Sequence, residues 1–186
     1  MDIRYSTLEE IHDAILPLTR LNKRALCEYA YTLLELYLSF MQVVNKMTRE
    51  YAVKYGFDKQ LKDVRVSFRG RRKVGINKSR ICLGLCYYTK GVISINPVMI
   101  LAMPDHTRPV MLHELCHFKI HGHPRRFYVL LEDLMHREQV GYYYPFILSG
   151  RRSEEFMWMI KEVYDYYKKK KQKEARAAAK LATTGK

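Results

Sequence analysis

Four histidines and one glutamate fall within the eleven residues of HELCHFKIHGH, residues 113–123. The segment contains the HExxH pattern, with Glu114 following the first histidine. On a helix, residues four apart point in nearly the same direction, so two imidazoles spaced this way can bind one Zn²⁺. Glu114 would lie beside the metal, where it can take a proton from zinc-bound water and deliver it to the leaving amine. The pattern therefore predicts His113 and His117 as zinc ligands and Glu114 as the catalytic acid and base of a peptidase.

A third ligand has to come from later in the chain. His121 continues the series on the same helix face, but it would lie about 12 Å along the axis from His113. Three ligands in a row along a straight helix cannot converge on one tetrahedral ion. Gly122 can turn the chain back, because glycine tolerates the left-handed conformation that ends helices, and His123 follows it directly. We therefore predict His123 as the third ligand of a single Zn²⁺ ion, with three alternatives further on: Glu132, His136 and Glu138.

The residues around the motif indicate a buried helix with an open metal site. Apolar side chains flank the ligands, which is typical of an active-site helix rather than a solvated one. Cys116 and His121 are the near candidates for a fourth protein ligand, but position 116 points about 100° away from position 117 around the helix. A water would then fill the fourth zinc position. Four hydroxyl groups are candidates for stabilising the oxyanion: those of Tyr128, Tyr142, Tyr143 and Tyr144.

Helices are predicted on both sides of a small sheet. Ser6 followed by Glu9 indicates a capping box at the start of a first helix. An apolar stripe predicts a second, long helix from about residue 22 to residue 55, which Gly56 can end. Later helices are expected over residues 98–102, over the motif, from Pro124, and from near Ser153.

Residues 63–96 are expected to form a small antiparallel sheet. The alternation in DVRVSFR predicts a strand over 63–69, and RICLGLCYY and GVISIN predict two more, over 80–88 and 91–96. We expect the strand over 91–96 to offer an unpaired edge that receives an extended substrate as an added strand.

Positive charge is concentrated in two segments of a chain with a net charge of +14. Residues 65–80 contain seven basic residues and no acidic one, and residues 168–186 contain eight basic residues and one glutamate. Such segments indicate a polyanionic partner, with nucleic acid first. The predicted nucleic-acid contacts are Arg69, Arg71, Arg72 and Lys73.

The N-terminus lacks the basic start and apolar stretch of a signal peptide, and no apolar run approaches the ~18–20 residues of a membrane span. We therefore expect a cytoplasmic protein without a membrane partner. Its four cysteines fit neither a zinc knuckle nor a disulfide framework, so we expect reduced thiols: Cys27, Cys82, Cys86 and Cys116.

HELCHFKIHGHPRRFY resembles the metal motif of the YgjP-like, SprT-like and WLM zinc metallopeptidases, and the upstream LGLCYYTKGVISINPVMI fits the YgjP-like pattern best. The resemblance covers about residues 63–135. It implies zinc binding by His113, His117 and His123, catalysis by Glu114, and a zincin-like fold of helices packed on a small sheet. The SprT-like and WLM branches are linked to proteolysis of proteins attached to DNA.

Together these observations predict an α+β protein: long N-terminal helices, a small antiparallel sheet, an active-site HExxH helix and C-terminal helices. We expect one metallopeptidase domain over 1–167, helical over 1–56 and with the sheet and active-site helix over 63–140, followed by a basic tail over 168–186. The expected function is zinc-dependent hydrolysis of peptide bonds in a protein or peptide substrate, with DNA-associated proteins among the candidate substrates. Two other functions would use the same residues: a nucleic-acid-binding module with a structural zinc, and zinc-dependent hydrolysis of nucleotides or other phosphate esters.

Overall fold

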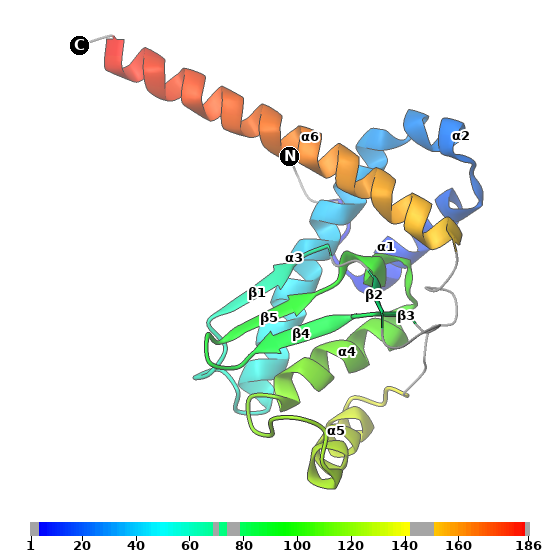
Figure 1. The fold of residues 1–186 in the computed structure, drawn as a ribbon, viewed down its shortest axis with the longest axis vertical. Coiled ribbons are helices and arrows are strands. Elements are labelled where there is room, and N and C mark those ends of the chain that lie inside the picture. The colour runs from blue at the N-terminus through cyan, green and yellow to red at the C-terminus, as the bar shows by residue number, and fades with distance from the viewer. Residues whose placement is uncertain (1–3, 69–70, 74–78, 142–150, 185–186) are drawn as a thin grey trace.

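The computed structural model describes residues 4–68, 71–73, 79–141 and 151–184. Helices surround a small sheet (Figure 1), and the predicted α+β class is confirmed. The helices before the sheet are α1 (Leu8–Ile15), the 3-10 helix η1 (Leu18–Arg20), α2 (Lys23–Glu28) and α3 (Ala30–Lys54). The strands are β1 (Asp63–Val66), β2 (Arg71–Lys73), β3 (Ser79–Ile81), β4 (Gly84–Tyr87) and β5 (Val92–Ile95). The later helices are the 3-10 helix η2 (Pro97–Leu101), α4 (Pro104–Cys116), α5 (Arg125–Arg137) and α6 (Arg151–Thr184).

The main sheet has the strand order β1-β5-β4, and β2 and β3 form a separate antiparallel pair. β4 and β5 are antiparallel and joined by a tight turn in which Gly91 has a φ of 68°. β5 then lies parallel to β1, with Val64 opposite Ile93. The prediction of an all-antiparallel sheet was therefore wrong for this pair, because β5 enters between β1 and β4. For the same reason β5 is the central strand, so the prediction that it offers an unpaired edge was also wrong.

The core lies between the sheet and the helices α3 and α4. α3 contacts β1, while α4 contacts β4 and β5, so both helices pack against the sheet. β5 is buried along its whole length, as expected of a central strand. The fully buried residues come from all three elements: Leu33, Leu36 and Val44 of α3, Ile93 and Ile95 of β5, and Met111, Leu112 and Leu115 of α4. The helix with the HExxH pattern is thus held by its apolar side.

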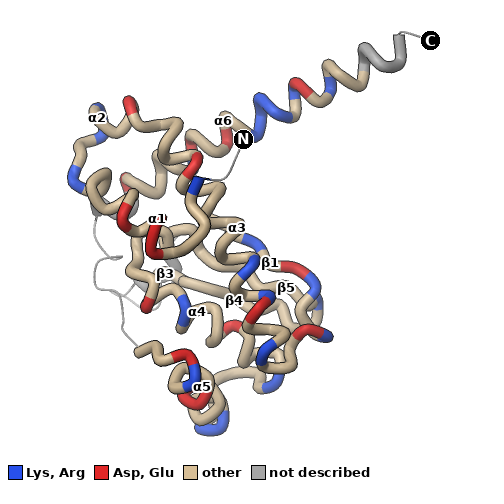
Figure 2. Tube along the Cα trace, turned by 180° about the vertical axis from the view of Figure 1, so that it is seen from behind, with Lys and Arg blue, Asp and Glu red and all other residues tan. Residues whose placement is uncertain are grey.

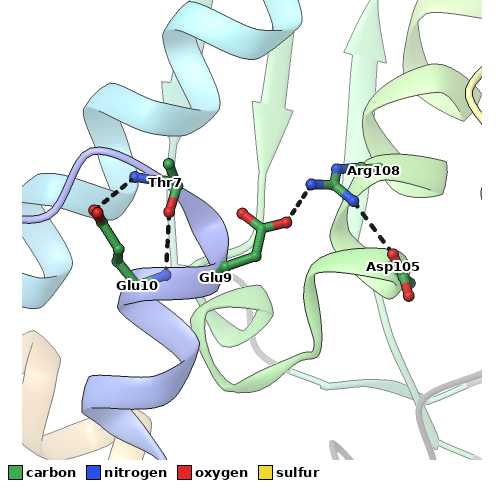
Figure 3. Close-up of polar contacts among 5 residues, drawn as sticks. All are labelled: Thr7, Glu9, Glu10, Asp105 and Arg108. Atoms are coloured by element: carbon green, nitrogen blue, oxygen red, sulfur yellow. Dashed lines mark hydrogen bonds and ion pairs between the residues drawn. The ribbon is translucent and has the colours of Figure 1, made fainter.

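The capping box of α1 lies one residue later than predicted. The Thr7 hydroxyl accepts a hydrogen bond from the Glu10 backbone N–H at 3.1 Å, and the Glu10 carboxylate accepts one from the Thr7 N–H at 3.2 Å (Figure 3). Both Ser6–Glu9 and Thr7–Glu10 have the required spacing, so sequence alone does not distinguish them. Because Glu10 closes the box, Glu9 is available to pair with Arg108 of α4.

The predicted long helix over residues 22–55 is two helices. Asn22 caps α2 by accepting a hydrogen bond from the Ala25 N–H at 3.0 Å. The chain then changes direction at Tyr29, whose φ of −99° and ψ of 15° lie outside the helical range. Neither glycine nor proline marks this break, which is why the sequence did not reveal it. Gly56 follows the end of α3 with a φ of 71°, as the predicted stop requires.

α6 extends past the body of the protein. Its first part packs against α3, and the rest continues as a rod away from the other elements (Figure 1). The basic segment from residue 168 is therefore helical to Thr184. Among the described residues, no helix has both the length and the apolar composition needed to cross a membrane.

Candidate metal centre

The three predicted metal ligands lie together at the end of α4. His113 belongs to its last turn, His117 is its C-cap residue, and His123 lies in the loop before α5. One nitrogen from each ring lies within 4.8 Å of the others, and the Nε2 atoms of His113 and His123 are 3.0 Å apart. Two nitrogens bound tetrahedrally to one Zn²⁺ at 2.0–2.1 Å would be ~3.3 Å apart. The three side chains therefore fit a single zinc ion, and imidazole is a ligand that zinc favours.

The protonation and orientation of the rings suit a metal. Burial lowers the pKa of His113 to about 4, and the neighbouring His117 and His123 act in the same direction. Burial also lowers the pKa of His117. Near neutral pH both rings are thus uncharged, the form that binds a metal. The Nδ1–H of His117 donates to the carbonyl of Ile120 at 3.2 Å, which leaves Nε2 to face the other histidines.

The ring of Phe127 contacts all three histidine rings. This role was not predicted from the sequence. Its side chain is fully buried, and its ring centroid lies 4.8 Å from His113, 4.6 Å from His117 and 4.8 Å from His123. A rigid aromatic surface on which three imidazoles rest limits their rotation. The available signal was the aromatic residue four positions after His123, on the first turn of the next helix.

Glu114 follows His113 on α4 and is buried at 5% exposure, where carboxylates are rare. It packs against Gly84 of β4. A Cβ atom placed on Gly84 would lie 2.6 Å from Glu114 Oε1 and 2.7 Å from its Cγ, so only glycine leaves room for this carboxylate. A glycine inside an otherwise apolar strand marks a close approach of this kind. The glycine in RICLGLCYY could have indicated this contact, but no role was predicted for Gly84.

Gly84→Ala is expected to lower the turnover number at least about tenfold without loss of zinc. The new methyl group displaces the side chain of Glu114, the predicted acid and base, and small misplacements of a catalytic group cost large factors in rate. The three atoms nearest to the added methyl position all belong to Glu114, so zinc affinity should stay at the wild-type value. Steady-state kinetics with zinc titration checks both. Wild-type turnover, or a joint loss of zinc and activity, would contradict the assigned contact.

The helix that carries the motif ends earlier than expected. α4 ends at Cys116, one turn before His121, and the backbone N–H groups of residues 118–120 close the end by bonding to the carbonyls of Leu115 and Cys116. Gly122 has a φ of 75°, the left-handed conformation predicted for it. His121 points elsewhere and stacks on Tyr88, with ring centroids 3.8 Å apart.

Gly122→Val is expected to weaken zinc binding about tenfold although Gly122 touches no metal. No atom lies within 4 Å of the site where the Cβ would be, so the whole effect comes from a backbone that valine adopts only with strain of ~1–2 kcal/mol. Gly56→Val is the matched control, because Gly56 has a φ of 71° and equally open surroundings at the end of α3. Both variants should lose similar thermal stability. Equal zinc affinities in the two would show that Gly122 does not position His123.

The other predicted site residues fall outside this cluster. Within the described part of the chain, the histidine triad is the group that can hold a metal ion. Glu138 instead pairs with Lys54 at 2.7 Å and accepts a hydrogen bond from Tyr55. The alternatives Glu132 and His136 are exposed on α5. Cys116 is fully buried and its thiol pKa is raised by burial to about 12, which disfavours the thiolate that a metal requires.

Two sets of predicted residues remain without a structural test. Tyr128 is 47% exposed with its ring centroid 6.1 Å from that of His123, whereas residues 142–144 lie outside the described residues. Arg69 also lies outside them, and Arg71, Arg72 and Lys73 form β2, paired with β3. Roles in oxyanion stabilisation and in nucleic-acid binding therefore stay predictions for these residues.

Arg108 ties α4, the helix with the HExxH pattern, to the N-terminal helix α1. Its guanidinium donates to Asp105 within α4 at 3.2 Å and to Glu9 of α1 (Figure 3). The Arg108 side chain is three-quarters buried but half of the Glu9 side chain is exposed, so the pair contributes orientation more than stability. α1 thus helps to fix the orientation of α4 one and a half turns before His113.

A model of the YgjP-like metallopeptidase domain matches residues 42–140, just over half of the chain. The matched segment begins within α3 and ends after α5, so it contains the sheet, α4 and the histidine triad. Comparisons with curated proteins and with solved structures gave no match.

Proposed function

Because the chain belongs to the YgjP-like metallopeptidase family, we propose that it is a zinc-dependent peptidase in which His113, His117 and His123 hold the ion and Glu114 moves the protons. The observation that carries the proposal is the convergence of three imidazoles at the end of α4, the helix that also carries the buried carboxylate of Glu114. The family indicates a hydrolase that uses a metal, and the donor set favours zinc. Three protein ligands leave a fourth position, which a catalytic site needs and a structural site does not have.

The chemistry divides between the ion and the protein. Bound zinc supplies Lewis acidity, which polarises the substrate carbonyl and acidifies water. Glu114 accepts a proton from the attacking water and then donates it to the nitrogen of the departing amine. Gly84 lets the carboxylate lie against β4, and Phe127 together with the Ile120 carbonyl holds the imidazoles in place. The protein thereby fixes both the metal ligands and the proton carrier before substrate arrives.

We place the substrate along β4 rather than β5. β4 ends the order β1-β5-β4, so its outer side carries no strand partner among the described residues. It is also the strand that touches Glu114, through Gly84. An extended peptide added to this edge would bring its carbonyl groups past the carboxylate, with backbone hydrogen bonds fixing the register.

The substrate class we propose is proteins associated with nucleic acid. The support is electrostatic: the net charge of +14 favours a polyanion, and the basic residues are concentrated rather than scattered. DNA-bound proteins would then be concentrated near the peptidase site.

Purified protein loaded with one equivalent of Zn²⁺ should cleave an unstructured protein substrate such as casein. Activity should disappear with 1,10-phenanthroline and return when zinc is added back. Mass spectrometry of the products should show new peptide termini. Cleavage that survives full removal of zinc would contradict the proposal, as would hydrolysis of a phosphate ester with no cleavage of any peptide.

A further inference from the structure

The outer half of α6 is a strongly charged surface that the metal site does not use. Every residue from 168 to 179 is exposed on a helix that projects away from the body (Figure 1). These twelve positions hold six basic residues and one glutamate, and the basic positions gather where the helix leaves the other elements (Figure 2). A solvated helix that only maintained solubility would be expected to mix both signs of charge.

The charges on this segment include a stripe along one side. Tyr166, Lys169, Lys173 and Arg176 follow one another at spacings of three, four and three residues, which places them on the same face of a helix. Tyr166 begins the stripe with 71% of its side chain exposed. Glu174 lies about 100° around the helix from Lys173, so it does not interrupt the stripe. We call these four residues the α6 stripe.

The residue types in and around the α6 stripe favour nucleic acid over a membrane as the anionic partner. A helix that lies on a membrane needs a face of large apolar side chains, but the apolar residues between 168 and 179 are all alanines. Nucleic acid presents a regular row of phosphates, which suits cations spread over the ~10 Å from Lys169 to Arg176. An exposed aromatic ring next to such cations can stack on an unpaired base.

We propose that the α6 stripe binds single-stranded nucleic acid, with Lys169, Lys173 and Arg176 at phosphates and Tyr166 stacked on a base. The proposal deepens the suggested substrate class, but it does not depend on the peptidase chemistry. The α6 stripe is a different site from the nucleic-acid contacts predicted at residues 69–73, because it lies on a helix outside the sheet. Binding there would tether the peptidase to nucleic acid through an arm.

The test is fluorescence anisotropy of the full-length, zinc-loaded protein with a labelled single-stranded oligonucleotide between 50 and 200 mM salt. The variant Lys169→Gln/Lys173→Gln should weaken binding about tenfold at the low salt concentration and reduce the salt slope by ~1.4, about 0.7 for each lost phosphate contact. The matched control is Lys168→Gln/Lys171→Gln, which removes the same charge from other sides of the helix, where Lys171 lies over the Tyr167 ring at 5.6 Å. It should weaken binding less than about threefold.

Equal losses in the two double variants, or no binding at 50 mM salt, would overturn the proposal. Tyr166→Ala adds a second arm: it should weaken binding of the single strand several-fold, leave the salt slope unchanged, and leave a duplex of the same length unaffected. An equal effect on both nucleic acids, or none on either, would overturn the stacking role. Tighter binding to phosphatidylserine vesicles than to DNA would overturn the choice of partner. Cleavage of a short peptide should be unchanged in all these variants, so a failure here leaves the proposed zinc chemistry separately testable.

Discussion

Glu114→Gln is expected to abolish peptide hydrolysis and to leave zinc bound at wild-type affinity. Glutamine keeps the size of the side chain, so the contact with Gly84 is preserved. It cannot accept the proton of the attacking water, and loss of a positioned acid and base costs about 10²–10⁴-fold in rate. The three imidazoles have contacts of their own with Phe127, and His117 is also bonded to the Ile120 carbonyl. The measurements are the turnover number on a peptide substrate and the zinc content after dialysis.

Glu132→Gln is the matched control for this substitution. Glu132 is exposed on α5 and outside the triad, so the same change of charge there should leave activity within about twofold. Wild-type cleavage by Glu114→Gln would refute the proton-transfer role. Loss of zinc in Glu114→Gln would refute the separation between metal binding and proton transfer, because the carboxylate would then be needed for the site itself.

His123→Ala is expected to weaken zinc binding more than 100-fold, whereas His121→Ala should bind zinc as the wild type does. The two histidines are separated only by Gly122, but the structure assigns them different surroundings. His123 lies within 3.0 Å of His113 Nε2, while His121 stacks on Tyr88. Loss of an outer hydrogen-bond partner alone costs 10–100-fold in metal affinity, so loss of a ligand should cost more. Competition with a zinc-binding dye measures both affinities.

Comparing His123→Ala with His121→Ala also shows which residue is the third zinc ligand. If His123→Ala kept its zinc, a ligand from α5 such as His136 would have to replace it. If His121→Ala lost zinc, the stack on Tyr88 would be only one of two positions of that ring. Either result would contradict the ligand set proposed here.

The clustering of the three histidines could be predicted from the sequence because its geometry is local. His113 and His117 share a helix face by their spacing, and Gly122 is the residue able to turn the chain toward His123. The helix itself was predicted from its apolar flanks, which are buried against the sheet. Its end was misplaced by one turn, because nothing in FKI at residues 118–120 signals that the helix stops at Cys116.

Long-range features could not be predicted in the same way. The hydrophobic pattern identified β5 as a strand, but it does not specify that β5 enters between β1 and β4 and runs parallel to β1. The contact between Gly84 and Glu114 joins residues thirty positions apart, and the contacts of Phe127 with the histidines depend on how α5 packs against α4.

The continuation of α6 as a helix follows from its alanine and lysine content, which favours helix even without an apolar stripe.

The most direct test of the zinc peptidase account is a crystal structure with zinc, with data collected at the zinc absorption edge. The account predicts a single anomalous peak bound by His113, His117 and His123 at ~2.0–2.1 Å, with no fourth protein ligand and with the Glu114 carboxylate beside the remaining position. A fourth protein ligand such as Cys116 or His121, or a peak away from these three histidines, would contradict it.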